Sequence, residues 1–190
     1  MEHFKIFDWR HFFPSQENKN KYLAEVKEYI NKNYTELHDQ PGAIRYNLDN
    51  AVHDGCFNLF ILNHDVNDYL FNFFKSKSVF IKFIRYRNPL YLKGEQELHY
   101  DWIVKNNEKR IEMFVLLDDM DSNNGGLVIM QNDTITPINT EAGSCIIMDS
   151  TILHGGTKNN NGKSRALIDI HIGVKTQGNE QCLRRILKKR

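Results

Sequence analysis

From Val79 onward the chain is a series of short segments rich in β-branched and apolar residues, separated by turn-forming clusters. The clearest turns are residues 121–125 (DSNNG) and 159–162 (NNNG). The predicted strands are residues 79–87, 98–103, 111–117, 126–130, 134–138, 144–149 and 165–174. Many short strands at this spacing, with polar turns between them, predict an antiparallel sandwich or barrel.

The first third of the chain has a different pattern. Ser15 is a predicted cap for a helix over residues 16–33, whose apolar residues recur at the three-and-four spacing of one helical face. A second helix is predicted over residues 64–76, and the apolar run 56–62 is predicted as a strand between them. The fold class expected is therefore α+β, with helices first and a jelly-roll-like body after them.

The chain is long enough for one compact domain, with 190 residues of which 41% are hydrophobic. We expect residues 1–78 to be mainly helical support, residues 79–175 to form the β core and residues 176–190 to be a basic tail. That tail is predicted to be a solvated terminal helix rather than a polyanion site. The formal net charge of +1 gives no reason to expect nucleic acid or a membrane as a partner. The oligomeric state is not predictable.

The chain has three cysteines, Cys56, Cys145 and Cys182. Their odd number and long spacings fit free thiols better than a disulfide framework. Cys145 lies in an apolar run and is expected to be a buried thiol. The first residues are charged throughout, unlike a signal peptide, and no run approaches the roughly 20 apolar residues of a bilayer span. These features predict a cytoplasmic protein.

The residues with the most chemical content are His99, Asp101 and His154. Residues two apart on an extended strand point to the same side, so His99 and Asp101 are expected to present an imidazole and a carboxylate to one point. His154 lies 53 residues beyond Asp101, after a predicted strand and before an expected turn at Gly155-Gly156. If it joins the pair, the set is the two-histidine, one-carboxylate face of non-haem iron oxygenases. Alternatively, His99 is a hydrogen-bonded strand histidine and Asp101 caps a turn.

Arg165 follows His154 by 11 residues and opens the apolar strand 166–170. A guanidinium at the start of a core strand is costly unless it meets an anion. Its planar fork matches a carboxylate, and the distal carboxylate of 2-oxoglutarate would satisfy it. The alternative is a rim arginine paired with Glu141 or Asp149.

Three other residues admit two interpretations each. Arg85 and Arg87 share one face of the first core strand, where they could hold an anionic substrate, although salt bridges at the sheet edge are the simpler interpretation. His171 could line the cavity, but a hydrogen-bonded structural histidine is the simpler reading of its position.

These residues, in this order, resemble the phytanoyl-CoA dioxygenase family of iron(II)/2-oxoglutarate oxygenases. The resemblance covers residues 79–173, about half of the chain. The matching motifs are 94–102 (GEQELHYDW), 124–126 (NGG), 142–144 (AGS), 154–156 (HGG) and 165–167 (RAL).

The resemblance implies a double-stranded β-helix, of the jelly-roll or cupin-like kind, with the N-terminal helices packed on one sheet. It implies Fe(2+) held by His99, Asp101 and His154, with Arg165 anchoring 2-oxoglutarate and O2 as the oxidant. Gln96 and Tyr86 are candidates for a polar contact to the cosubstrate. Gly156 stands where many members have a serine, and Thr157 is a possible substitute.

The function expected from the resemblance is hydroxylation of a C–H bond in a small molecule, with release of succinate and CO2. An aspartate at the carboxylate position favours hydroxylation over halogenation, because related halogenases have a small non-ligating residue there. Three alternatives stay open: the same chemistry on a protein or carrier-bound side chain, a cupin-like enzyme that uses no 2-oxoglutarate, and a non-catalytic ligand-binding module. Desaturation and ring closure are also compatible with these ligands.

Overall fold

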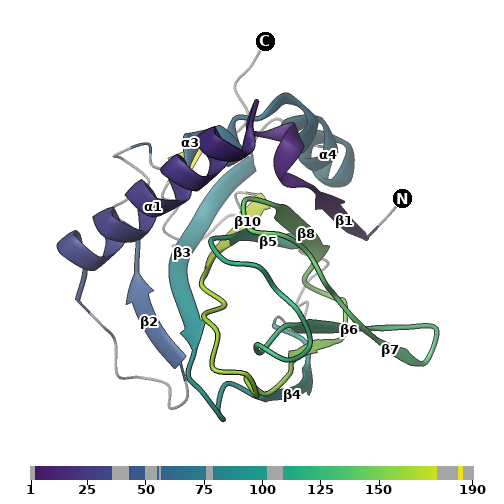
Figure 1. The fold of residues 1–190 in the computed structure, drawn as a ribbon. Coiled ribbons are helices and arrows are strands. Elements are labelled where there is room, and N and C mark those ends of the chain that lie inside the picture. Colours follow the sequence, from purple (N-terminus) through teal and green to yellow (C-terminus); the bar gives the residue numbers. More distant parts are fainter. Residues whose placement is uncertain are drawn as a thin grey trace.

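Two antiparallel sheets lie one above the other, with the helices on the outer face of the larger sheet (Figure 1). The structure is a computed structural model that describes residues 3–35, 43–49, 55, 57–75, 79–101, 109–174 and, by backbone alone, 184–185. The larger sheet contains β1 (Phe4–Phe7), β8 (Cys145–Asp149), β5 (Arg110–Leu116), β10 (Leu167–Val174), β3 (Val79–Pro89) and β11 (Arg184–Arg185), in that order, and β2 (Ala43–Asn47) also pairs with β3. The smaller sheet has the order β4 (Gln96–His99), β9 (His154–Gly156), β6 (Leu127–Gln131), β7 (Thr134–Pro137). This arrangement is the predicted double-stranded β-helix.

The two faces of the larger sheet carry different residues. On β10, Ile168 and Ile170 belong to the core beneath the helices, whereas Leu167 belongs to the core between the two sheets. Because side chains alternate along a strand, Asp169 and His171 also face the space between the sheets. One half of that space is therefore apolar, and the other half contains polar and charged side chains.

The helices cover the outer face. They are η1 (Trp9–His11), α1 (Gln16–Asn33), α3 (Asn58–Ile61) and α4 (His64–Phe74). Ser15 caps α1 as predicted, accepting a hydrogen bond from the Asn18 backbone N–H. Leu23, Val26 and Ile30 are buried against the sheet. In the described part of the chain no helix combines the length and apolar character needed to cross a membrane.

Three local predictions are wrong. Residues 57–62 contain the short helix α3 rather than a strand, because Phe57, Phe60 and Ile61 are spaced to bury one helical side. Gly155 and Gly156 continue strand β9 instead of forming a turn. Arg184 and Arg185 pair with β3 as a strand and not as part of a helix; the rest of the basic tail lies outside the described residues. Cys145 is buried as predicted, while Cys56 and Cys182 lie outside the described residues.

Asp118 connects helix α1 to the segment that carries Arg165. Its carboxylate pairs with Lys27 of α1, accepts a hydrogen bond from the Ser164 hydroxyl at 2.5 Å and accepts another from the Ala166 backbone N–H at 3.0 Å. Burial alone would raise the pKa of Asp118, but these hydrogen bonds outweigh it and hold the pKa below its usual value. Asp118 therefore fixes the chain on both sides of Arg165.

Asp118→Asn is expected to lower the free energy of unfolding by about 1.5–3 kcal/mol at neutral pH, the range for hydrogen bonds to a charged group. A carboxyl whose pKa is depressed in the folded state contributes stability above its unfolded pKa and loses it as the pH falls through the folded pKa. The difference between wild type and variant should therefore shrink as the pH falls below about 4. Urea unfolding at neutral and acidic pH measures it. Asp133→Asn, in the exposed β6–β7 turn, should change stability by less than about 0.5 kcal/mol.

Candidate metal centre

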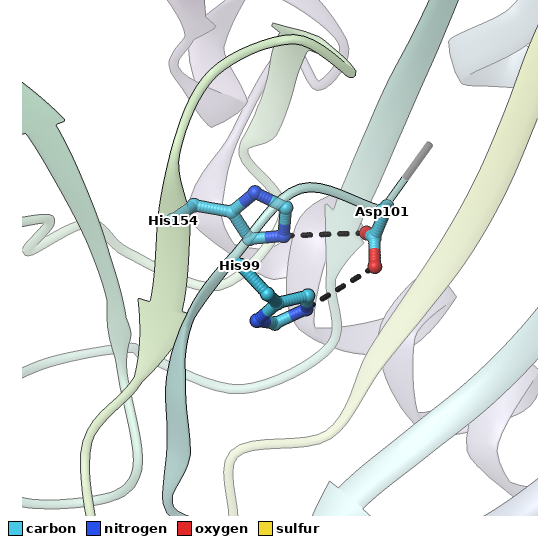
Figure 2. A group of neighbouring side chains, drawn as sticks. All are labelled: His99, Asp101 and His154. Atoms are coloured by element: carbon cyan, nitrogen blue, oxygen red, sulfur yellow. Dashed lines mark ion pairs between the residues drawn. The ribbon is translucent and has the colours of Figure 1, made fainter. Parts of the chain in front are cut away.

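His99, Asp101 and His154 meet at one point between the sheets (Figure 2). The Nε2 atoms of His99 and His154 each lie 3.2 Å from a different oxygen of the Asp101 carboxylate. The three donor atoms all lie within 4.8 Å of one another. The two histidines are brought together because β4 and β9 are neighbours and His99 is directly opposite His154 in the register.

Backbone carbonyls orient both imidazole rings. His99 Nδ1 lies 2.7 Å from the Glu97 carbonyl oxygen, and His154 Nδ1 lies 2.9 Å from the Ile152 carbonyl oxygen. A carbonyl can only accept a hydrogen bond, so we assign the ring hydrogen to Nδ1 in both residues, which leaves the Nε2 lone pair of a neutral ring directed at Asp101. Two lone pairs facing a carboxylate require a cation among them, either a proton or a metal ion. This tautomer is the one that a metal-ligating histidine uses.

The electrostatics of Asp101 and His154 agree with that arrangement. Burial alone would raise the pKa of Asp101, but hydrogen bonds with His154 and Glu112 outweigh it and place the pKa well below its usual range. Burial alone would lower the pKa of His154, but the hydrogen bond with Asp101 outweighs it and raises the pKa. Asp101 is thus an anion, and positive charge is favoured next to it.

Strand β4 ends at His99, and Asp101 follows it in a bend rather than in the strand that was predicted over residues 98–103. The prediction that the two side chains converge is nevertheless correct. Residues 102–103 lie outside the described residues.

Glu112 is a neighbour of the centre that the sequence did not reveal. It is fully buried on β5, and its Oε2 lies 3.8 Å from His154 Nε2. Burial, followed by the proximity of Asp101, raises the pKa of Glu112 to about 11, so its carboxyl group is protonated. The only sequence signal was an acidic residue inside the apolar run 111–117.

His171 and Asp169 complete the polar half of the interior. The His171 ring stacks on Phe83 with a centroid distance of 3.8 Å, and its Nε2 lies 3.2 Å from Asp169 Oδ1. His171 is therefore held as a structural histidine in the way the sequence favoured, although it faces the cavity. Asp101, Glu112 and His171 form a second group of donor atoms within 4.8 Å of one another.

Arg165 lines a narrow cavity next to the three-residue centre. The cavity also includes Arg87, Gln96, His154 and an apolar wall formed by Phe114, Met120, Leu127, Ile146 and Leu167. Arg165 is 9% exposed, and within the described part of the chain its Nε has no hydrogen-bond partner. Burial, with the like charge of Arg87 second, lowers the pKa of Arg165 to about 9. A buried guanidinium in this state is unfavourable until an anion meets it.

Neither acid that the sequence offered as a partner for Arg165 fills that role. Asp149 pairs with His3 at 2.9 Å, and Glu141 contacts Trp9 and Lys19 on the helix side. The cavity has a volume of about 30 Å³, room for about two waters. A five-carbon dicarboxylate therefore fits only after the long side chains of Arg87, Gln96 or Arg165 move. The charge and position of Arg165 suit such an anion.

The remaining predicted contacts divide into one that reaches the site and two that do not. Gln96 lines the cavity opposite Gly156. Tyr86 lies on the other face of β3, in the core beneath the helices, where its ring packs against Tyr46 with centroids 5.1 Å apart. The hydroxyl of Thr157 donates to the Gly126 carbonyl at 3.3 Å, and Thr157 is not part of the cavity wall. Side chains alternate along β3, and Arg85 and Arg87 occupy the positions that face the cavity, so the Tyr86 side chain faces away from it.

Gly155 and Gly156 provide a matched pair for testing the support of His154. A Cβ at Gly155 would lie 2.6 Å from the Gln96 carbonyl oxygen on β4, whereas a Cβ at Gly156 would meet no atom closer than 3.4 Å. Gly155→Ala is expected to separate β9 from β4, lowering the free energy of unfolding by about 1–3 kcal/mol and weakening metal binding. Gly156→Ala is the control and should leave stability nearly unchanged. Thermal unfolding and metal titration measure both effects; equal behaviour of the two variants would contradict this account of β9.

Comparisons with solved structures support the fold. HygX from Streptomyces hygroscopicus, crystallised with nickel and 2-oxoglutarate, has a TM-score of 0.74 at 11% identity, with 94% of this chain and 85% of that chain covered. The non-heme alpha ketoglutarate dependent epimerase SnoN from nogalamycin biosynthesis has a TM-score of 0.71 at 10% identity, covering 92% and 80%. AviO1 from Streptomyces viridochromogenes Tue57 has a TM-score of 0.63 at 15% identity, covering 88% and 89%.

At these identities the likeness establishes the fold alone. No protein-family model matches the sequence, and no curated protein matches it either. Membership of the phytanoyl-CoA dioxygenase family therefore stays a prediction from the motifs.

Proposed function

We propose that this protein is an Fe(2+)- and 2-oxoglutarate-dependent dioxygenase that oxidises a C–H bond of a small molecule. The observation that carries the proposal is the convergence of His99, Asp101 and His154, with both imidazoles oriented by backbone carbonyls and both Nε2 atoms 3.2 Å from the carboxylate. Two histidines and one carboxylate on one face are the ligand set of non-haem ferrous oxygenases. Arg165, whose Nε meets no hydrogen-bond acceptor among the described residues, lies in the adjoining cavity and supports 2-oxoglutarate as the cosubstrate.

Ferrous iron and 2-oxoglutarate, when bound, supply the activation of O2 and the oxidising equivalents, with succinate and CO2 as products. The residues of this chain bind and orient. His99, Asp101 and His154 would hold the metal. Arg165 binds the distal carboxylate of 2-oxoglutarate, and Gln96 contributes a polar group to the same cavity.

Buried residues around the centre keep it in place and restrict water. The buried Glu112 carboxyl lies next to the centre, with its Oε2 3.8 Å from His154 Nε2, and its raised pKa favours the uncharged form beside the Asp101 carboxylate. Phe114, Leu127 and Leu167 form an apolar wall beside Arg165, which strengthens the attraction between the guanidinium and a carboxylate.

Hydroxylation is the outcome we favour for the C–H bond. Asp101 occupies the carboxylate position, so no site is left for a halide ligand at that place. The likeness to SnoN, described as an epimerase, makes hydrogen-atom chemistry without oxygen insertion a second outcome to examine in the products.

Succinate release from 2-oxoglutarate tests the proposal. Purified protein is supplied with ferrous iron, ascorbate and 2-oxoglutarate in air, alone and with a panel of small metabolites, carrier-bound amino acids and peptides. We expect iron-dependent succinate formation that one class of compound stimulates. Consumption of O2 and a substrate without any loss of 2-oxoglutarate would instead support a cupin-like enzyme of another kind. Binding of compounds without turnover by the iron-loaded protein would support a non-catalytic module.

A further inference from the structure

A second, wider cleft of about 510 Å³ opens beside the metal centre. Its wall contains the metal-centre residues His99 and Asp101 and three arginines, Arg45, Arg85 and Arg87. The size is in the range of small-molecule sites. The position, adjoining two of the three proposed ligands, is where a substrate for the centre would lie.

Strand pairing brings the three arginines together. Arg85 and Arg87 are two residues apart on β3 and share the inward face. Arg45 on β2 is directly opposite Arg87 in the antiparallel register, so their Cβ atoms are neighbours. Arg45 is only 7% exposed, although it is an arginine near the end of a sheet. The sheet thus places three guanidinium groups on one wall of the cleft.

Three arginines line the cleft together with two acidic residues, Glu97 and Asp101. Arg87 Nη1 is 4.0 Å from Asp169 Oδ2, the only ion pair recorded for Arg85 or Arg87 within the described residues. The Arg85 guanidinium lies 4.3 Å from the Phe83 ring centroid, a cation–π contact that leaves its charge uncompensated. Asp101 is committed to the metal centre. Salt bridges at the sheet edge, the simpler interpretation of these two arginines, therefore explain part of the position of Arg87 and do not explain that of Arg85.

We propose that this cleft binds the substrate through an oxyanion, so that the substrate carries a carboxylate or a phosphate group close to the C–H bond that reacts. Guanidinium groups form paired charge-assisted hydrogen bonds with such anions. Calling the bound molecule a substrate rests on the proposed function, but the binding of an anion in the cleft does not depend on it. Arg165 belongs to the other cavity, and Arg85 lines only the wider cleft, which makes Arg85 the residue to test.

The test is a calorimetric titration of inorganic phosphate, and separately of acetate, into protein kept anaerobic with ferrous iron and saturating 2-oxoglutarate. Saturation with 2-oxoglutarate removes Arg165 as a competing anion site. We expect one anion per chain in the wild type, about tenfold weaker binding in Arg85→Gln, and weaker binding at higher ionic strength. Arg10→Gln removes an equally charged but exposed arginine on the helix side and should bind as the wild type does. The stronger of the two anions identifies phosphate or carboxylate as the recognised group.

Two readouts separate this inference from the proposed function. The visible absorbance that develops when ferrous iron and 2-oxoglutarate bind together reports on the metal centre. If that absorbance appears but neither anion binds, or Arg85→Gln binds as tightly as wild type, the cleft inference is overturned and the oxygenase proposal stands. If the absorbance is missing but phosphate or acetate binding depends on Arg85, the oxygenase proposal fails and the anion site stands.

Discussion

Asp101→Ala is expected to reduce succinate formation by about 1000-fold or more, because a first-sphere carboxylate contributes several kcal/mol through the metal that it holds. The structure supplies the reason. Asp101 is the only anionic member of the three-residue centre, and each of its oxygens faces one imidazole at 3.2 Å. Without it, two neutral imidazoles are left to bind ferrous iron. Succinate formation at saturating iron and 2-oxoglutarate, with iron affinity measured alongside, tests the prediction.

Asp68→Ala is the matched control, since Asp68 is an exposed carboxylate on α4 with 61% of its side chain accessible. It should retain wild-type activity and iron affinity. Turnover by Asp101→Ala at more than a tenth of the wild-type rate would show that Asp101 is not a ligand.

Arg165→Met is expected to raise the dissociation constant for 2-oxoglutarate about 10- to 100-fold, equivalent to the loss of one paired hydrogen bond to a charged group. The affinity for iron should stay as in the wild type, because among the described residues Arg165 makes no hydrogen bond or ion pair with the three proposed ligands. Methionine fills much of the same volume without the buried charge, so the free energy of unfolding should be unchanged or higher. Anaerobic titration of the iron-loaded variant with 2-oxoglutarate measures the affinity.

Arg165→Lys separates charge from shape. Lysine keeps the positive charge but lacks the planar fork, so an intermediate affinity is expected. An Arg165→Met protein with unchanged affinity for 2-oxoglutarate would place the cosubstrate elsewhere, for example against Arg87, which also lines that cavity.

The β core could be predicted because its strands alternate and end in polar turns. Helix α1 matched its predicted residues 16–33, and β5, β7, β8 and β10 lie within one or two residues of their predicted bounds. The strands β1, β2 and β9 could not be predicted, because each is short and is formed by pairing with a distant segment rather than by local propensity. Helix α3 was mistaken for a strand because nearly every residue of the run 56–62 is apolar, so the helical spacing of its buried residues was not distinct in the sequence.

For the candidate site, the residue types and spacing of His99, Asp101, His154 and Arg165 were enough to predict that these side chains lie near one another. The polar contacts to the cosubstrate could not be predicted in this way, since a polar residue near a motif can face either side of its strand. Tyr86 is one residue from Arg87, and this single step places it on the helix side. Glu112 and Arg45 reach the site only through the register of β5 with β10 and of β2 with β3, which no local pattern encodes.

The most direct test of the metal and cosubstrate assignment is a crystal structure of the protein with a redox-inert divalent metal and 2-oxoglutarate under anaerobic conditions. The account predicts an anomalous peak within bonding distance of His99 Nε2, His154 Nε2 and an Asp101 oxygen, with one carboxylate of 2-oxoglutarate against the Arg165 guanidinium. A metal held instead by Asp101, Glu112 and His171, or 2-oxoglutarate bound away from Arg165, would contradict it.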